Sequence, residues 1–434
     1  MNIPNVILDK LAPMDTHKTI TNLLFITVFF LFGGGMIMLT GHVERSWLAR
    51  SIWACIYVSA MGYGFLISRL LLSRIVEAPG FMVLSVLCLF SIFWSSAPST
   101  TASYAIALFG ATLIAYIIVL KLEAFQLLKN ATTALLLLIV VNVLLMIPNL
   151  GYNLSGAGRF SGIFPQANML GRMASLGILL LSLLALSDRY PKFLAGIGII
   201  GGTLLVLACN SMTSIMAVIL SLSLFFLRRS IGRPVGDGVI LIMSWLLLCC
   251  GGLLWLNSES IVDFLFNLIG RSPTLTGRTG LWEGVRDAIY LKPILGYGYS
   301  GFWTGEHLLT ERIFNHAGWE TESAHNGLYE IALNVGLVGV VTFILVIGRS
   351  LLNAFKFTFT GHSKLAPVLL SILTYLLILG ATESAYMIRN SINWVLMTLC
   401  TLYLKKLSLE EGMGRVLGAD NTFNAGNYAN MPKK

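Results

Sequence analysis

Long apolar runs, separated by short polar stretches, make up most of the chain. A run of about 20 apolar residues is long enough to cross a bilayer as a helix. The pattern therefore predicts an all-α integral membrane protein with about twelve transmembrane helices. The predicted spans are 20–40, 48–68, 80–95, 102–120, 130–149, 170–187, 192–209, 212–227, 238–256, 333–352, 365–381 and 391–404.

Composition and charge agree with a membrane protein. Only 11% of the residues are charged and 56% are apolar, whereas soluble domains carry roughly 25% charged residues. The net charge of +9 comes largely from Lys and Arg in alternate connections, which is the pattern of cytoplasmic loops. This places both termini in the cytoplasm and explains the basic charge without a nucleic-acid partner.

One connection is much longer than the others. Residues 257–332 join predicted helices 9 and 10 and are extracytoplasmic in this orientation. They divide the chain into an N-terminal bundle of about nine helices (1–256), the loop (257–332), the C-terminal helices (333–404) and a cytoplasmic tail (405–434). Within the loop, 280–291 has the spacing of an amphipathic helix, which we expect on the membrane surface. Residues 292–303 are rich in Gly and Pro and predict turns.

Arginines collect on the same side of the membrane as this loop. Connections 155–172 and 382–394 reach that side, and each carries Arg, although positive charge is normally avoided there. The guanidinium group offers paired donors that suit phosphate oxygens. We therefore expect a diphosphate pocket, while the alternative for each single Arg is a lipid-headgroup anchor. The candidate residues are Arg159, Arg271, Arg278 and Arg389.

His325 is the sharpest catalytic candidate. It precedes a helix expected to begin near Asn326 or Gly327, with Glu322 and Glu330 close by in sequence. A histidine with carboxylate neighbours can take a proton from a sugar hydroxyl or, when protonated, hold a leaving diphosphate. The alternative is a structural histidine at the helix start. The six cysteines lie in apolar segments without metal-ligand spacing, so we expect a metal-independent reaction without a cofactor.

His325-Asn326, followed by Gly336 and Gly339, resembles the signature of the O-antigen ligase and O-antigen polymerase superfamily, which includes exopolysaccharide polymerases. Further segments resemble motifs of that family in the same order. They are LFSIFWSSAP (89–98), GRFSGIFPQANMLG (158–171), GRTGLW (277–282), PILGYGYSGF (293–302) and TESAYMIRNSINW (382–394).

The resemblance implies a glycosyltransferase related to the GT-C class that acts at the periplasmic face of the bacterial inner membrane. The donor would be an oligosaccharide on undecaprenyl diphosphate. By position, His325 would be the essential histidine, and Arg159 and Arg278 would be the arginines at the diphosphate. We expect His325 and Arg278 to be catalytic. Asn326, Glu322 and Glu330, close to His325 in sequence, are expected to support substrate binding. One departure concerns 211–213, Ser-Met-Thr, which lacks a basic residue frequent in the family.

The acceptor distinguishes the members of this superfamily. A polymerase extends another lipid-linked repeat, a ligase transfers the glycan to lipid A core, and a protein O-oligosaccharyltransferase transfers it to Ser or Thr. The 47-residue spacing from Arg278 to His325 favours a polymerase, with a chain-length regulator as a candidate partner. A glycolipid flippase or transporter is the alternative from another class, but it would be expected to show repeat symmetry and mid-membrane charges.

Overall fold

The computed structural model describes residues 16–40, 46–147, 159–230, 276–304, 308–318, 320–361 and 363–428. Helices and turns account for this part of the chain, and it contains no extended strand, so the all-α prediction is confirmed. The chain divides into two compact units. The first comprises Met1–Ile56, Leu122–Leu222 and Asn390–Ile392, and the second comprises Tyr57–Lys121, Ser223–Arg389 and Asn393–Lys434.

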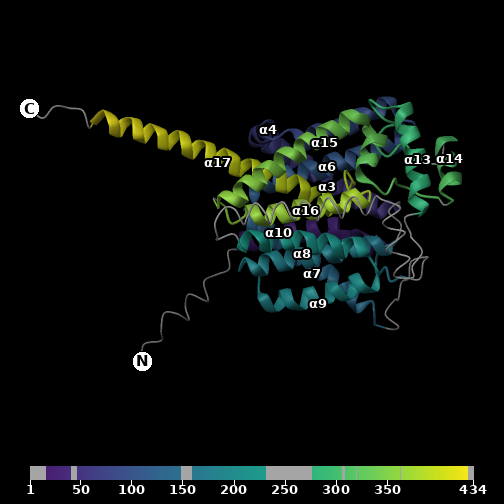
Figure 1. Cartoon of the computed structure of the whole chain (residues 1–434), viewed down its shortest axis with the longest axis horizontal. Helices are drawn as coiled ribbons and strands as arrows, with labels where there is room; N and C mark the ends of the chain where they lie inside the picture. The colour runs from purple at the N-terminus through teal and green to yellow at the C-terminus, as the bar shows by residue number, and fades with distance from the viewer. Residues whose placement is uncertain are drawn as a thin grey trace, which may run out of the picture. The chain divides into compact units, whose positions relative to one another are not determined.

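The first unit is a helical bundle. In it α7 contacts α1, α8 and α9, and α8 and α9 pack closely along their length (Figure 1). Small residues allow this approach: a Cβ on Gly177 of α8 would lie 2.6 Å from the Ile139 side chain of α7. The helices are α1 (Thr16–Phe30), η2 (Leu31–Gly35), α2 (Met36–Thr40), the start of α3 (Trp47–Leu66), α7 (Ala124–Leu144), α8 (Ala167–Leu186), α9 (Lys192–Ala208) and α10 (Met212–Ser230), whose last residues enter the second unit.

The second unit carries the end of α3 and the segments around His325. α15 packs against α5, α13 and α16, so it connects the helices of this unit. Its described helices after α3 are α4 (Ser68–Glu77), α5 (Gly80–Phe90), η3 (Ser91–Trp94), α6 (Pro98–Lys121), α13 (Thr276–Leu291), α14 (Leu308–Ala317), α15 (Gly327–Thr360), α16 (Ala366–Thr382) and α17 (Ile392–Tyr428).

A helix occupies most of each predicted span within the described residues, although α17, at the predicted span 391–404, is not among the helices apolar enough to cross a membrane. By length and composition five of these helices can cross a membrane, or six if α3 and α4, bent by 96°, form one span. Several others are shorter apolar helices, and the predicted span 238–256 lies outside the described residues. The protein is therefore a multi-pass membrane protein, while the count of twelve and the GT-C relation stay predictions.

The amphipathic helix predicted at 280–291 exists as the C-terminal part of α13, but its apolar face is covered by protein. Leu281, Val285 and Ala288 are buried in a cluster with Phe302, Ile313 and other residues of the second unit. α13 and α14 lie side by side (Figure 1). The expectation that this face rests on the membrane surface is wrong, because α14 and the turns after α13 cover it.

Candidate functional site

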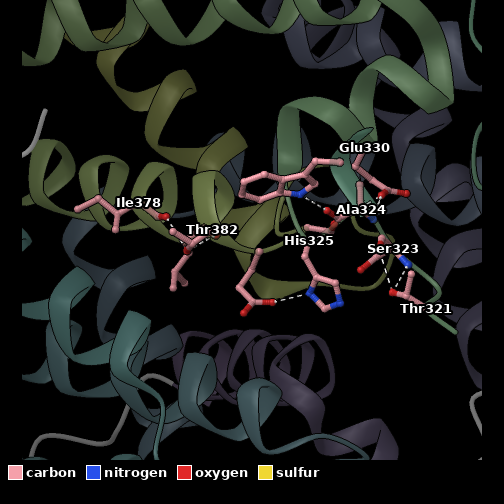
Figure 2. Close-up of polar contacts among 11 residues, drawn as sticks. Thr321, Ser323, Ala324, His325, Glu330, Ile378 and Thr382 are labelled. Carbon is pink, nitrogen blue, oxygen red and sulfur yellow. Dashed lines mark hydrogen bonds and ion pairs between the residues drawn. The ribbon is translucent and has the colours of Figure 1, made fainter. Parts of the chain in front are cut away.

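His325 lies at the end of a short loop that leads into α15 (Figure 2). Asn326 caps the helix, its side-chain oxygen accepting hydrogen bonds from the N–H groups of Leu328 and Tyr329. His325 has a φ of 47°, a left-handed conformation that costs roughly 1–3 kcal/mol for a residue other than Gly. The predicted helix start is confirmed, and the cap and the loop hold the histidine backbone in an unusual conformation.

Two hydrogen bonds hold the backbone of Ala324, the residue before His325. The indole N–H of Trp282 in α13 donates to the Ala324 carbonyl at 2.9 Å. The Ala324 N–H donates to the Glu330 carboxylate at 2.9 Å. Ala324 is fully buried, so both bonds form away from competing water and restrict where the His325 ring can lie.

The carboxylate beside the imidazole comes from a distant segment. Glu383 follows α16, and its Oε2 lies 3.4 Å from Nδ1 of His325. The His325 side chain is 20% exposed and that of Glu383 is 9% exposed. If Nδ1 carries the proton shared with Glu383, Nε2 has the lone pair that can accept a proton. The pair has the geometry of an oriented general base.

Glu330, predicted near the substrate from its place five residues after His325, is hydrogen-bonded to the segments around the histidine. Its carboxylate accepts hydrogen bonds from Trp303 Nε1 at 3.1 Å and from the Ala324 N–H at 2.9 Å, and the Ser384 hydroxyl lies 3.5 Å away. These contacts join the turns after α13, the His325 loop and the segment after α16. Glu330 therefore holds three segments together. Glu322 is exposed.

The predicted turns at 292–303 are confirmed. They are hydrogen-bonded to α15 at a break in that helix. Val335 and Gly336 leave the helical conformation. Around this break the carbonyls of Leu333 and Asn334 accept hydrogen bonds from the N–H groups of Tyr297 and Gly298, while the Leu337 N–H donates to Pro293. The broken helix thus keeps its backbone polar groups paired.

The two glycines at this break allow the close backbone approach. Gly336 has a φ of 66°, and a Cβ there would lie 2.0 Å from the Ile294 carbonyl oxygen. Gly296 has a φ of 64°, and a Cβ there would lie 2.5 Å from the Leu333 carbonyl oxygen. The first glycine of the His-Asn…Gly…Gly signature is therefore required by the backbone.

Residues 89–98, called the Trp-Ser segment below, and Thr101 of α6 bind the same turns. Trp94 Nε1 donates to the Leu295 carbonyl at 2.9 Å, and the Ser96 hydroxyl donates to the Gly301 carbonyl at 3.0 Å. The hydroxyl of Ser91 accepts from the Tyr299 N–H at 2.9 Å, and that of Thr101 donates to the Tyr299 carbonyl at 2.8 Å. These hydrogen bonds hold the turns in position.

Tyr299 connects the turns to the segment that carries Glu383 and Arg389. Its hydroxyl donates to the Met387 carbonyl, and burial raises the pKa of the Tyr299 hydroxyl well above its usual value. The guanidinium carbon of Arg389 lies 3.3 Å from the centre of the Tyr104 ring, a cation–π contact that orients the group. Arg389 and His325 belong to the same unit. Residues 383–389 connect Arg389 with Glu383, the carboxylate beside His325.

Arg159 belongs to the first unit. The motif around it packs on helices of that unit: Asn142 Oδ1 accepts from the Ile163 N–H at 3.0 Å, and a Cβ on Gly162 would lie 2.0 Å from that oxygen. Gly162 thus lies close to the Asn142 side chain. The charge of Arg159 acts on the Cys209 side chain that follows α9. Arg159 therefore lies near the turn between α9 and α10.

The other predicted phosphate ligands are only partly described. Arg271 lies outside the described residues, and Arg278 lies in the first turn of α13 with its side chain outside them. The convergence of Arg159, Arg278 and His325 on one diphosphate stays a prediction. Glu383 was missed, because nothing in the sequence indicates a contact across 58 residues. The one indication of Glu383 in the sequence is that it lies in segment 382–394, which also carries the candidate Arg389.

Comparisons with known proteins agree with the motifs. Residues 197–344, which include α13, the turns and the His325 loop, match the O-antigen ligase family. The resemblance to the O-antigen ligase and polymerase superfamily is confirmed. The exopolysaccharide production protein ExoQ of Rhizobium meliloti strain 1021 is 25% identical over 279 residues, which cover 61% of this chain and 62% of that protein. The match thus covers less than two thirds of this relative and connects the chain with polysaccharide synthesis at a membrane.

Proposed function

We propose that the protein is a polysaccharide polymerase that transfers a glycan from undecaprenyl diphosphate to the sugar of another lipid-linked repeat. The observation that carries the proposal is the pairing of His325 with Glu383 at the capped start of α15. An imidazole held by a carboxylate at a protein surface suits the removal of a proton from an acceptor hydroxyl. The resemblance to proteins of O-antigen and exopolysaccharide synthesis supplies the substrate class.

The reaction exchanges one bond at the anomeric carbon. The acceptor hydroxyl oxygen forms a bond to that carbon while Nε2 of His325 takes its proton. The bond between the carbon and the diphosphate oxygen breaks, and undecaprenyl diphosphate leaves with the electron pair. Glu383 keeps Nδ1 protonated and lies next to the positive charge that the ring acquires. The leaving group needs cationic partners because its charge increases as the bond breaks.

Arginines are better suited to bind the leaving diphosphate than the N–H groups at the start of α15. The N–H groups of Leu328 and Tyr329 already donate to Asn326, so they are not available to a phosphate. Arg278, at the start of α13, and Arg159 are the proposed diphosphate ligands, with Arg389 and Arg271 as further candidates. Arg389 is held on Tyr104, in the same unit as the histidine. The site would face the periplasm.

An O-antigen ligase that transfers the glycan to lipid A core is the second candidate. The match of residues 197–344 to the ligase family favours it, whereas the likeness to an exopolysaccharide production protein favours the polymerase. The two enzymes share donor, base and leaving group, so the His325 site suits both. Assay of each acceptor with the same purified protein separates them.

The direct test is turnover of an undecaprenyl-diphosphate oligosaccharide by purified protein in vesicles. We expect longer lipid-linked products from the unchanged protein and a loss of transfer of at least about 10³-fold in His325→Ala and Arg278→Ala. Glu311→Gln is the control, because Glu311 is exposed on α14 and is not one of the predicted site residues. Full transfer by folded His325→Ala would overturn the proposal, and transport of the glycolipid without bond formation would indicate a flippase.

A further inference from the structure

The turns after α13 carry an exposed apolar surface that the proposed chemistry does not use. Ile294 and Leu295 are 64% and 41% exposed, and Tyr290 and Leu291 at the end of α13 are also exposed. Between residues 288 and 304 the only charged side chain is Lys292. Side chains of this kind are rarely left in water as a contiguous group.

This surface is continuous with the outer face of α15. The Leu337 N–H donates to the Pro293 carbonyl at 2.7 Å, and the Val338 N–H donates to the Ile294 carbonyl at 3.4 Å. The side chains of Leu337 and Val338 are exposed, as are Ile344 and Leu345 further along the same helix. The surface of the turns therefore extends the exposed apolar face of a helix that can span a membrane.

Apart from Leu328, the exposed large apolar side chains of α15 all follow its break. Before the break Ile331, Ala332 and Leu333 are buried, and after it the exposed apolar side chains follow one another. The whole helix has 34 residues, about 51 Å at 1.5 Å per residue, which is longer than the bilayer requires. The part from 337 to 360 is about 36 Å long and is sufficient to cross the hydrocarbon core.

We propose that the turn Pro293–Leu295 and the end of α13 are immersed in the bilayer, in contact with lipid acyl chains. The three carbonyls of the turn are paired within the protein, as such a position requires: those of Pro293 and Ile294 accept from α15, and that of Leu295 accepts from Trp94. Lys292 lies with its ammonium 4.8 Å from the centre of the Tyr297 ring and is long enough to reach the headgroups. The His325 loop, bonded to the same scaffold, is thereby held close to the membrane surface.

The proposal does not depend on the reaction assigned to His325, and spin labels in vesicles test it. Nitroxides are placed at Ile294→Cys and Leu295→Cys, with Leu345→Cys as the reference for lipid contact. Glu283→Cys, on the exposed polar face of α13, is the reference for water, and the unsubstituted protein gives the background of native cysteines. Relaxation by oxygen, which concentrates in hydrocarbon, is compared with relaxation by a water-soluble nickel chelate.

We expect the ratio of oxygen to nickel relaxation at Ile294 and Leu295 to match that at Leu345 and to exceed that at Glu283 several-fold. Ratios equal to that at Glu283 would place the turn in water and overturn the proposal. Protection from both reagents would overturn it too, because protein would then cover the surface. Each labelled variant must elute as the unsubstituted protein does, and Leu291→Cys replaces any variant that fails.

Discussion

Two glutamates contact the segments around His325, and they differ in what they bind. Glu330 accepts hydrogen bonds from the Trp303 indole and the Ala324 backbone, groups that carry no charge and have fixed positions. Glu383 lies beside the imidazole of His325, a group that changes its charge when it takes a proton. Glu330 is only five residues from His325 in sequence, yet the distant carboxylate is the one that lies next to the ring.

The difference separates the scaffold of the site from its chemistry. The turns, the Trp-Ser segment and Glu330 use their polar groups to bind one another, so changes there should lower stability first. The His325–Glu383 pair is partly accessible, so changes there should lower activity first.

Replacing Glu383 by Gln should lower the rate of glycan transfer by about 10³-fold, within the usual range for a general base and its orienting partner. The amide keeps the shape but does not stabilise a positive ring or fix Nδ1–H in the same way. Transfer at saturating donor and acceptor measures the effect, with equal protein in the membrane as the control. An unchanged rate would show that Glu383 is only a packing residue.

Replacing Glu330 by Ala should lower the free energy of unfolding by about 3 kcal/mol, because the Trp303 and Ala324 N–H groups lose their acceptor. Glu330→Gln should lose less, since one acceptor oxygen remains. Thermal unfolding in detergent measures both variants. If Glu330→Ala kept full stability while transfer was lost, Glu330 would belong to the chemistry, as its sequence position first indicated.

Gly336→Ala should destabilise the protein by about 2 kcal/mol, from the strain of a positive φ and from the clash with Ile294. Gly348→Ala, in the same helix, is the matched control, because a Cβ there meets nothing within 4 Å. The control should be neutral or more stable by up to about 1 kcal/mol. Equal melting temperatures for the two variants would contradict the tight approach of the turn to α15.

Ser96→Ala should cost about 1 kcal/mol of stability, the usual value of one hydrogen bond, because the Ser96 hydroxyl bonds the Gly301 carbonyl. Ser103→Ala is the control, since that exposed hydroxyl bonds only within its own helix. The comparison uses melting temperatures together with transfer rates at low temperature, where both variants stay folded. A large loss of transfer without a loss of stability in Ser96→Ala would move the Trp-Ser segment into the chemistry.

Local patterns in the sequence predicted much of this arrangement. The sequence predicts the start of the helix after His325 and, from Gly and Pro, the turns at 292–303, and the structure confirms both. The amphipathic pattern of 280–291 predicted a helix but not its covering, because a protein core and a membrane surface select the same apolar face. The pairing of Glu383 with His325 and the entry of the turn into α15 are tertiary contacts between distant segments. No local pattern encodes them.

A double-mutant cycle on His325 and Glu383 tests the central claim most directly. Transfer rates are measured for the unchanged protein, His325→Ala, Glu383→Gln and the double variant, in vesicles that contain equal amounts of folded protein. If the two residues act as one unit, the double variant transfers glycan as slowly as His325→Ala alone. If instead the two losses multiply, the residues act independently, and Glu383 does not serve the histidine.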